Sequence, residues 1–144
     1  MVSIAIDGSG NKWIGTGGYS WGVSDGLARF DGTNWTVYNT FNSGLPYDWI
    51  RSIAIDDSGN KWIGTYGGGL ALFDGINWTV YNTSNSGLPD NYVSSITIDD
   101  SNNKWIGTGD GLVWFDGTNW TVYHTSNSGL PGNFVTFISI DDSG

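Results

Sequence analysis

Acidic side chains supply most of the groups in this chain that could do chemistry. All 14 acidic residues are aspartates, cysteine is absent, and His124 is the only histidine. Doubled aspartates occur at Asp56-Asp57, Asp99-Asp100 and Asp141-Asp142. Calcium takes carboxylate and carbonyl oxygens, but the D-D-S-G-N spacing lacks the alternating ligands of a calcium loop and is typical of a tight turn. We therefore expect no metal and no cofactor.

Catalysis and several classes of partner are poorly supported by the composition. General acid–base sites need groups with divergent pKa values, whereas this chain repeats the same turn aspartates. We therefore expect no enzyme. A net charge of −9 with only five basic residues argues against nucleic acid, whose backbone attracts clustered lysine and arginine. No segment approaches about 18 consecutive apolar residues, so we expect no membrane span.

A glycine-rich stretch over residues 17–26 holds two aromatic residues suited to binding. Tyr19 and Trp21 could form a stacking platform for a sugar or another flat apolar group, because aromatic faces accept such surfaces. The alternative is that both rings cover a neighbouring structural unit. Two shorter loops at equivalent positions add Tyr66 and Asp110 as candidates.

Three Leu-Pro pairs are each followed by two variable residues and then by an aromatic residue. The variable pairs are Tyr47-Asp48, Asp90-Asn91 and Gly132-Asn133, and the aromatics are Trp49, Tyr92 and Phe134. We expect the aromatic residue to wedge between structural units, and we take Tyr47, Asp48, Asp90, Asn91 and Asn133 as recognition candidates. Arg51 follows the first of these aromatics, and we expect it to pair with Asp48. The alternative is that Arg51 meets an anionic group in a central channel.

The elements that position these residues come from one unit copied three times. NKWIGT recurs with Trp13, Trp62 and Trp105, and DG-x-NWTVY recurs with Trp35, Trp78 and Trp120. A period of about 40 to 50 residues is typical of propeller blades. In the second copy, segments 52–56, 61–65, 70–73 and 77–82 alternate or cluster apolar residues as short strands do, and turn residues separate them.

The sequence therefore predicts an all-β fold of four-stranded antiparallel meanders. Large apolar residues occur on both faces of the strands, which fits blades stacked around an axis, although an open β-solenoid is an alternative. We expect blade 1 over residues 1–48 with a loop insertion at 17–26, blade 2 over 49–91 and blade 3 over 92–133. Residues 134–144 then repeat the first strand of a fourth unit.

The string I-x-I-D-x-x-G-N-x-W-I-G-T, followed by GL-x-x-FDG and later LP, resembles the two-component regulator propeller repeat. The resemblance covers essentially the whole chain. It implies a β-propeller that senses a ligand, carbohydrate among the candidates, in a periplasmic or extracellular bacterial parent protein. Family propellers commonly need about seven blades, so three blades are a fragment or a protomer.

The extra first strand raises the question of how the blades close into a ring. Ile4, Ile53, Ile96 and Ile138 occupy equivalent positions, so three blades come with four first strands. We expect identical chains to close a ring of six or nine blades, with the carboxy-terminal strand latching onto the neighbouring chain. The alternative is a piece of a longer chain. The expected function is a non-catalytic scaffold or binding module that self-assembles.

Overall fold

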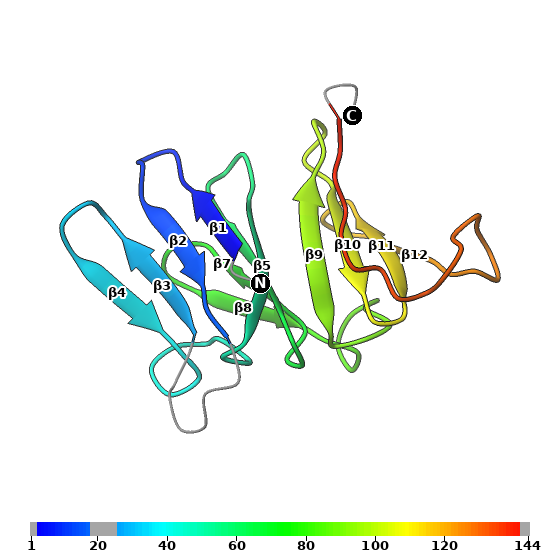
Figure 1. Cartoon of the computed structure of the whole chain (residues 1–144), viewed down its shortest axis with the longest axis horizontal. Helices are drawn as coiled ribbons and strands as arrows, with labels where there is room; N and C mark the ends of the chain where they lie inside the picture. The colour runs from blue at the N-terminus through cyan, green and yellow to red at the C-terminus, as the bar shows by residue number, and fades with distance from the viewer. Residues whose placement is uncertain (1–2, 18–25, 142–144) are drawn as a thin grey trace.

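A computed structural model describes residues 3–17 and 26–141. These residues form twelve β-strands and no helix (Figure 1). The first sheet contains β1 (Ser3–Ile6), β2 (Lys12–Gly15), β3 (Leu27–Phe30) and β4 (Trp35–Tyr38). The second contains β5 (Ile50–Ile55), β6 (Lys61–Thr65), β7 (Leu70–Phe73) and β8 (Trp78–Tyr81). The third contains β9 (Val93–Ile98), β10 (Lys104–Thr108), β11 (Gly111–Phe115) and β12 (Trp120–Tyr123).

Each sheet is an antiparallel meander whose strands pair in chain order. We call the sheets blade 1 (β1–β4), blade 2 (β5–β8) and blade 3 (β9–β12). The first strands β1, β5 and β9 are neighbours from blade to blade and form the inner edge, while β4, β8 and β12 form the outer edges. The predicted all-β fold of four-stranded antiparallel sheets is confirmed.

The hairpin turns repeat because the same turn residues recur in each copy. Gly32, Gly75 and Gly117 have φ values of 103°, 106° and 101° in the Asp-Gly turns, a backbone conformation that glycine adopts without steric cost. The preceding aspartate accepts two backbone N–H bonds in each turn; for example, Asp74 Oδ1 lies 2.8 Å from the Ile76 nitrogen and 2.7 Å from the Asn77 nitrogen. These contacts fix the hairpins that place the outer strands.

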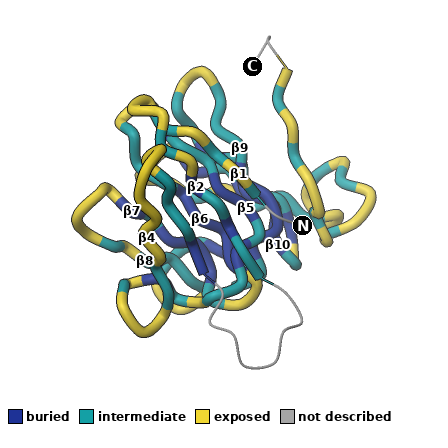
Figure 2. The backbone as a smooth tube through the Cα atoms, turned by 60° about the vertical axis from the view of Figure 1, so that its left-hand side comes forward, coloured by how far each residue is buried: buried dark blue, intermediate teal, exposed yellow. Residues whose placement is uncertain are grey.

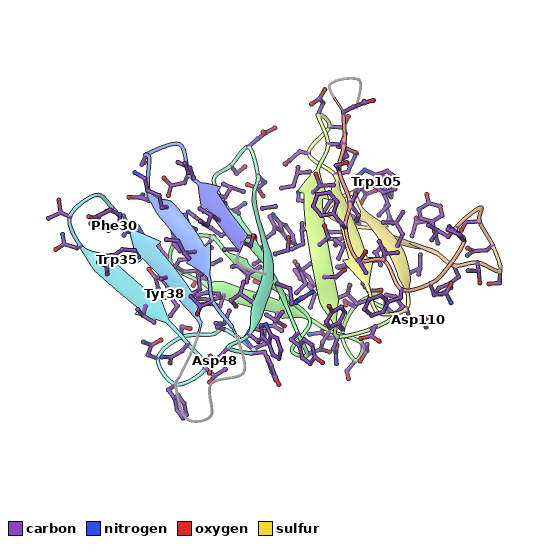
Figure 3. All side chains as sticks on the ribbon, in the orientation of Figure 1. Phe30, Trp35, Tyr38, Asp48, Trp105 and Asp110 are labelled. Carbon is purple, nitrogen blue, oxygen red and sulfur yellow. The ribbon has the colours of Figure 1, made fainter. Side chains whose placement is uncertain are left out.

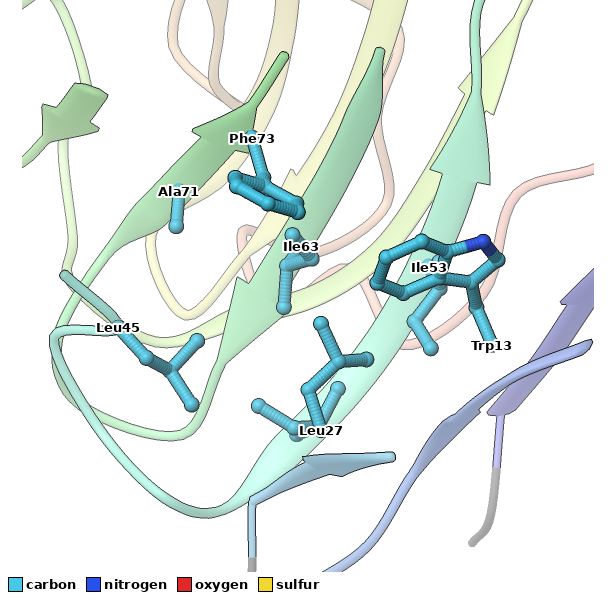
Figure 4. Packing of buried hydrophobic residues seen from close by; sticks show 8 residues of the cluster. Trp13, Leu27, Leu45, Ile53, Ile63, Ala71 and Phe73 are labelled. Carbon is cyan, nitrogen blue, oxygen red and sulfur yellow. The ribbon is translucent and has the colours of Figure 1, made fainter. Parts of the chain in front are cut away.

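The hydrophobic core consists of two clusters, each between neighbouring blades. Figure 2 shows buried residues gathered in the middle of the molecule and exposed residues in the turns. Between blades 1 and 2, the buried residues are Trp13, Leu27, Leu45, Ile50, Ile53, Ile63, Ala71 and Phe73 (Figure 4). The second cluster, between blades 2 and 3, repeats this set with Trp62, Leu70, Leu88, Val93, Ile96, Ile106, Val113 and Phe115. Burial on both faces explains why the strands carry apolar residues on both sides.

Residues 134–141 follow blade 3 and return to its inner edge, where they run beside β9 (Figure 1). The Val135 nitrogen donates to the Thr108 carbonyl at 3.1 Å, and the Ile138 nitrogen donates to Ser95 Oγ at 3.1 Å. This segment does not form a regular strand. No helix in the described ranges could cross a membrane.

Candidate functional site

The inner edges of the three blades and residues 134–141 border a groove of about 420 Å³. Its polar lining consists of Ser3, Arg51, Ser52, Ser94, Ser95, Thr97 and Thr136. Two of these hydroxyls join one blade to the next, because Ser3 Oγ and Ser52 Oγ each accept a backbone N–H bond from the following blade at 2.9 Å. A third, Ser95 Oγ, accepts one from the segment 134–141 at 3.1 Å. A serine hydroxyl that accepts a bond still has its own proton to donate. The groove therefore presents a hydroxyl donor at the same position of each successive inner segment.

Arg51 is the charged residue in this lining, and it does not pair with Asp48. The expected pair is wrong because Asp48 is held elsewhere: its Oδ1 accepts from the Thr40 nitrogen at 2.7 Å and its Oδ2 accepts from Thr40 Oγ1 at 2.9 Å. The Arg51 guanidinium carbon instead lies 5.4 Å from the centroid of the Tyr92 ring. Arg51 Nε is buried and has no hydrogen-bond partner among the described residues. The cation is thus held on an aromatic face with donor capacity left over.

Aromatic rings form a continuous strip that includes Tyr92, the ring on which Arg51 lies. Tyr66 stacks on Trp49 at 4.4 Å between centroids, lies 6.5 Å from Tyr47 and meets Tyr92 edge-on at 5.2 Å. Tyr92 in turn stacks on Phe134 at 5.5 Å. We call these five residues the aromatic strip. Tyr47 and Tyr66 are 42% and 43% exposed, so these two rings are accessible at the surface.

Three of the expected recognition residues have a structural contact in common. Asn91 Oδ1 accepts from the Thr83 nitrogen at 2.9 Å and Asn133 Oδ1 accepts from the Thr125 nitrogen at 2.8 Å, as Asp48 does with Thr40. Each of these side chains pins the loop that leaves the outer strand of its blade. The repeat of Asp, Asn and Asn before the aromatic residue was the signal that could have revealed this role. Recognition by these three residues remains a proposal.

Asp110 and Asn133 come together, and Asp90 bonds locally. Asn133 Nδ2 donates to Asp110 Oδ1 at 3.1 Å, and His124 Nε2 lies 2.8 Å from the Asp110 carbonyl oxygen. Asp90 Oδ1 accepts from the Tyr92 nitrogen at 2.6 Å. Figure 3 marks Asp48 and Asp110 on separate blades. The remaining two candidates, Tyr19 and Trp21, lie outside the described residues.

The first aspartate of each repeated turn holds the next tryptophan, a contact that the sequence did not reveal. Trp62 Nε1 donates to Asp56 Oδ2 at 2.9 Å, and Asn60 Nδ2 donates to the same oxygen at 3.0 Å. Trp13 and Trp105 make the same bond to Asp7 and Asp99. These carboxylates are therefore occupied by protein donors, and no group of three or more metal-ligating side chains occurs in the part of the chain that the structure describes.

The pKa values of these carboxyls reflect the same hydrogen bonds. Burial, the largest influence, raises the pKa of Asp7, but hydrogen bonds from Trp13 and Asn11 together outweigh it and lower that pKa from 3.8 to about 2. The pKa of Asp56 is lowered in the same way: burial raises it, and hydrogen bonds from Trp62 and Asn60 more than offset the rise. Both carboxyls are ionised at neutral pH and serve the fold rather than proton transfer.

Comparison with solved structures places the chain among propeller domains. It matches the extracellular domain of a hybrid two-component system, BT3049 from B. thetaiotaomicron, with a TM-score of 0.83 and 29% identity over 98% of this chain. It also matches the extracellular domain of a one-component system, BT4673 from the same organism, with a TM-score of 0.77 and 23% identity over 99% of this chain. This chain spans only 19% and 21% of those two chains.

A third match is to a protein of about this length. A fucose lectin from Kordia zhangzhouensis, solved in complex with methyl-fucoside, matches over 85% of this chain and 97% of its own, with a TM-score of 0.51 and 13% identity. At that identity the likeness concerns the fold alone. No family model and no curated protein matches the chain. The fold is therefore that of a β-propeller, and its neighbours include extracellular sensor domains.

Proposed function

We propose that this chain is a non-catalytic propeller module that binds a small carbohydrate in the groove along its inner edge. The observation that carries the proposal is the lining of that groove, where repeated serine hydroxyls lie beside Arg51, whose guanidinium in turn lies on the Tyr92 ring of the aromatic strip. Sugars present hydroxyls on their rims and C–H surfaces on their faces, so this combination of donors and rings complements both. The volume of about 420 Å³ is enough for a small ligand.

Two further observations support this class of ligand. The fucose lectin binds methyl-fucoside on a related fold, and the two bacterial sensor domains are extracellular. We propose accordingly that the chain belongs with the two-component regulator propeller repeats and that its parent protein acts in the periplasm or outside the cell. The exposed tyrosines of the aromatic strip, Tyr47 and Tyr66, are the residues we propose for stacking.

We propose that the working form is a closed ring of two or three chains, with six or nine blades. The groove runs along the inner edges of the blades, and a ring would enclose it. Light scattering after size exclusion, across a dilution series, tests this directly. Two or three times the chain mass of 15.5 kDa supports the ring, and the mass of one chain contradicts it.

Binding is tested on a glycan array that includes methyl-fucoside together with neutral and acidic oligosaccharides, followed by calorimetry on the strongest hit. Arg51→Ala should weaken that hit by roughly tenfold to a hundredfold, since a hydrogen bond to a charged group contributes about 1.5–3 kcal/mol. Arg29→Ala is the matched control, because Arg29 bonds to Asn11 in blade 1 and does not line the groove. No binding to any glycan by the folded, unmodified chain would refute the proposal.

A further inference from the structure

The face of blade 3 that turns away from blade 2 is an incomplete copy of an interface that occurs twice inside the chain. We call this side of each blade its trailing face. Trp13 and Trp62, on the trailing faces of blades 1 and 2, are 2% and 4% exposed, whereas the equivalent Trp105 is only half-buried. Trp105 instead lines an open apolar groove of about 430 Å³ with Leu112, Tyr123 and Leu130. This groove has the composition of the buried interfaces.

Inside the chain, an aromatic pair from the next blade fills this groove. Phe73 and Trp78 of blade 2 stack on each other at 4.5 Å, and Phe73 lies 6.0 Å from Trp13. Phe115 and Trp120 of blade 3 do the same at 4.0 Å, with Phe115 lying 6.0 Å from Trp62. What fits the Trp105 groove is therefore a stacked Phe–Trp pair on the outer strands of another blade.

Glycines mark how closely the tryptophan of that pair approaches. A Cβ added to Gly87 would lie 2.3 Å from the Trp120 Cβ, and one added to Gly44 would lie 2.4 Å from the Trp78 Cβ. At the third equivalent position, Gly129, nothing lies within 4 Å. The surface at Gly129 is thus shaped for a tryptophan that this chain does not supply there.

The missing half of the interface is present at the other end of the same chain. Phe30 and Trp35 of blade 1 stack at 4.6 Å, and Trp35 is 63% exposed (Figure 3). Ile4 on the same face is 63% exposed, whereas its equivalents in blades 2 and 3 are each 7% exposed. Lys61 and Lys104 lie 4.9 Å from Trp13 and Trp62 of the preceding blade, and the exposed Lys12 holds the same position in blade 1. Blade 1 therefore offers the groups that the Trp105 groove lacks.

Residues 134–141 already occupy the place of an inner strand beyond blade 3. The Ile138 nitrogen bonds to Ser95 Oγ as the Ile96 nitrogen does to Ser52 Oγ and the Ile53 nitrogen does to Ser3 Oγ. A Cβ added to Gly107 of blade 3 would lie 3.0 Å from Val135. Cβ atoms added to the equivalent Gly15 and Gly64 would likewise lie close to Ile50 and Val93. A second copy whose blade 1 docks on the Trp105 groove would therefore bring its β1 into a position that is already filled.

We propose that two or more copies of this chain join head to tail, and that residues 134–141 of one copy replace β1 as the inner strand of blade 1 in the next. The inference rests on the proposed ring and specifies how it closes. Residues 134–141 include Val135, equivalent to the fully buried Ile50 and Val93. Exchange of one strand per copy gives every blade four strands and leaves no inner edge open, as in a domain swap.

Engineered disulfides test the exchange, since the chain has no cysteine of its own. Ile6 pairs with Lys12 across β1 and β2, and Ile140 takes the place of Ile6 after exchange. Directly opposed strand residues have Cα atoms about 4.5–5.5 Å apart, a separation that a disulfide spans. The exchange predicts that Lys12→Cys with Ile140→Cys oxidises to covalent dimers or trimers, and that Lys12→Cys with Ile6→Cys forms no bond within one chain.

Controls separate this inference from the proposed function. The single variant Lys12→Cys measures random coupling. The double variant Ile14→Cys with Ile138→Cys repeats the test two residues further along the strands, where Ile4 pairs with Ile14. The exchange is overturned, and the ring is left standing, if light scattering gives the mass of a ring while Lys12→Cys with Ile6→Cys forms a disulfide within one chain. The mass of a single chain at all concentrations overturns both. Glycan binding is measured separately and is not decided by either result.

Discussion

The glycines at the end of each blade offer a matched test of how the blades pack. Gly87→Ala would place a Cβ 2.3 Å from the Trp120 Cβ, far inside van der Waals contact. The Trp120 Cβ is fixed to the backbone of β12, so relief requires that the loop or the strand move. Overpacking of this kind costs about 1–3 kcal/mol. For a chain of this size we expect the melting temperature to fall by roughly 2–4 °C for each kcal/mol.

Gly129→Ala is the same substitution at the equivalent position of blade 3, where an added Cβ meets nothing within 4 Å. The φ of Gly129 is not positive, so alanine fits its backbone. In a single chain we expect no loss of stability and a gain of up to about 1 kcal/mol, because alanine reduces the entropy of the unfolded chain. In an assembled ring, the added methyl would meet the Trp35 of a second copy and should cost about as much as Gly87→Ala does.

The assay is urea unfolding followed by tryptophan fluorescence, at concentrations for which light scattering has given the mass. Gly87→Ala within about 0.3 kcal/mol of the unmodified chain would refute the packing argument, since overpacking predicts several times that amount. An equal loss for both variants in a sample that has the mass of one chain would refute the assignment of Gly129 to an open face. An equal loss only in an oligomeric sample supports the head-to-tail interface.

Three further perturbations test the polar contacts. Asp56→Asn should cost about 1–3 kcal/mol in urea unfolding, because its amide nitrogen would face the Trp62 and Asn60 donors; Asp57→Asn, at an exposed position, should stay within about 0.5 kcal/mol. The folded pKa of Asp7 lies below its unfolded value, so its contribution to stability is complete above about pH 4 and is lost as the pH falls towards about 2; thermal melts between pH 2 and 7 should show this decline. Lys104→Ala should destabilise the chain by about 0.5–2 kcal/mol, because Lys104 is buried 4.9 Å from the Trp62 ring, whereas Lys12→Ala, at the exposed equivalent, should be near neutral in a single chain. Equal effects of the two lysine variants in that state would contradict the cation–π argument.

The repeat made most of the fold predictable. Each of the three copies has its own turn residues and predicts the same strand order, and every sheet of the structure has that order. The contact between Tyr66 and Tyr47 agrees with the meander, because the loops after the second and fourth strands of a blade lie at the same end of the sheet. Local turn chemistry and apolar patterning are sufficient for such features.

Side-chain partners were less predictable, because they depend on distances that the spacing does not determine. Arg51 and Asp48 are near neighbours in sequence, yet Thr40 is the partner of Asp48, since the loop that leaves blade 1 folds back over it. The bond from Trp62 Nε1 to Asp56 spans a hairpin, and the sequence states only that both residues recur. Recurrence shows that a contact exists in every blade, but the contact itself must be seen.

Differences between the copies are therefore the best guide to ligand recognition. Where all blades have the same residue at one position, as they do at the position of Asp56, the structural contact that this residue makes in every blade explains its presence. Arg51 does not recur: Ser94 and Thr136 occupy its position in the other inner segments, and all three line the same groove. Arg51 Nε is buried without a hydrogen-bond partner among the described residues, and burial of an unpaired polar group carries a cost. That cost is offset most simply by a ligand that accepts a hydrogen bond from Arg51, which is why the groove rather than the repeated turns is the place to look for function.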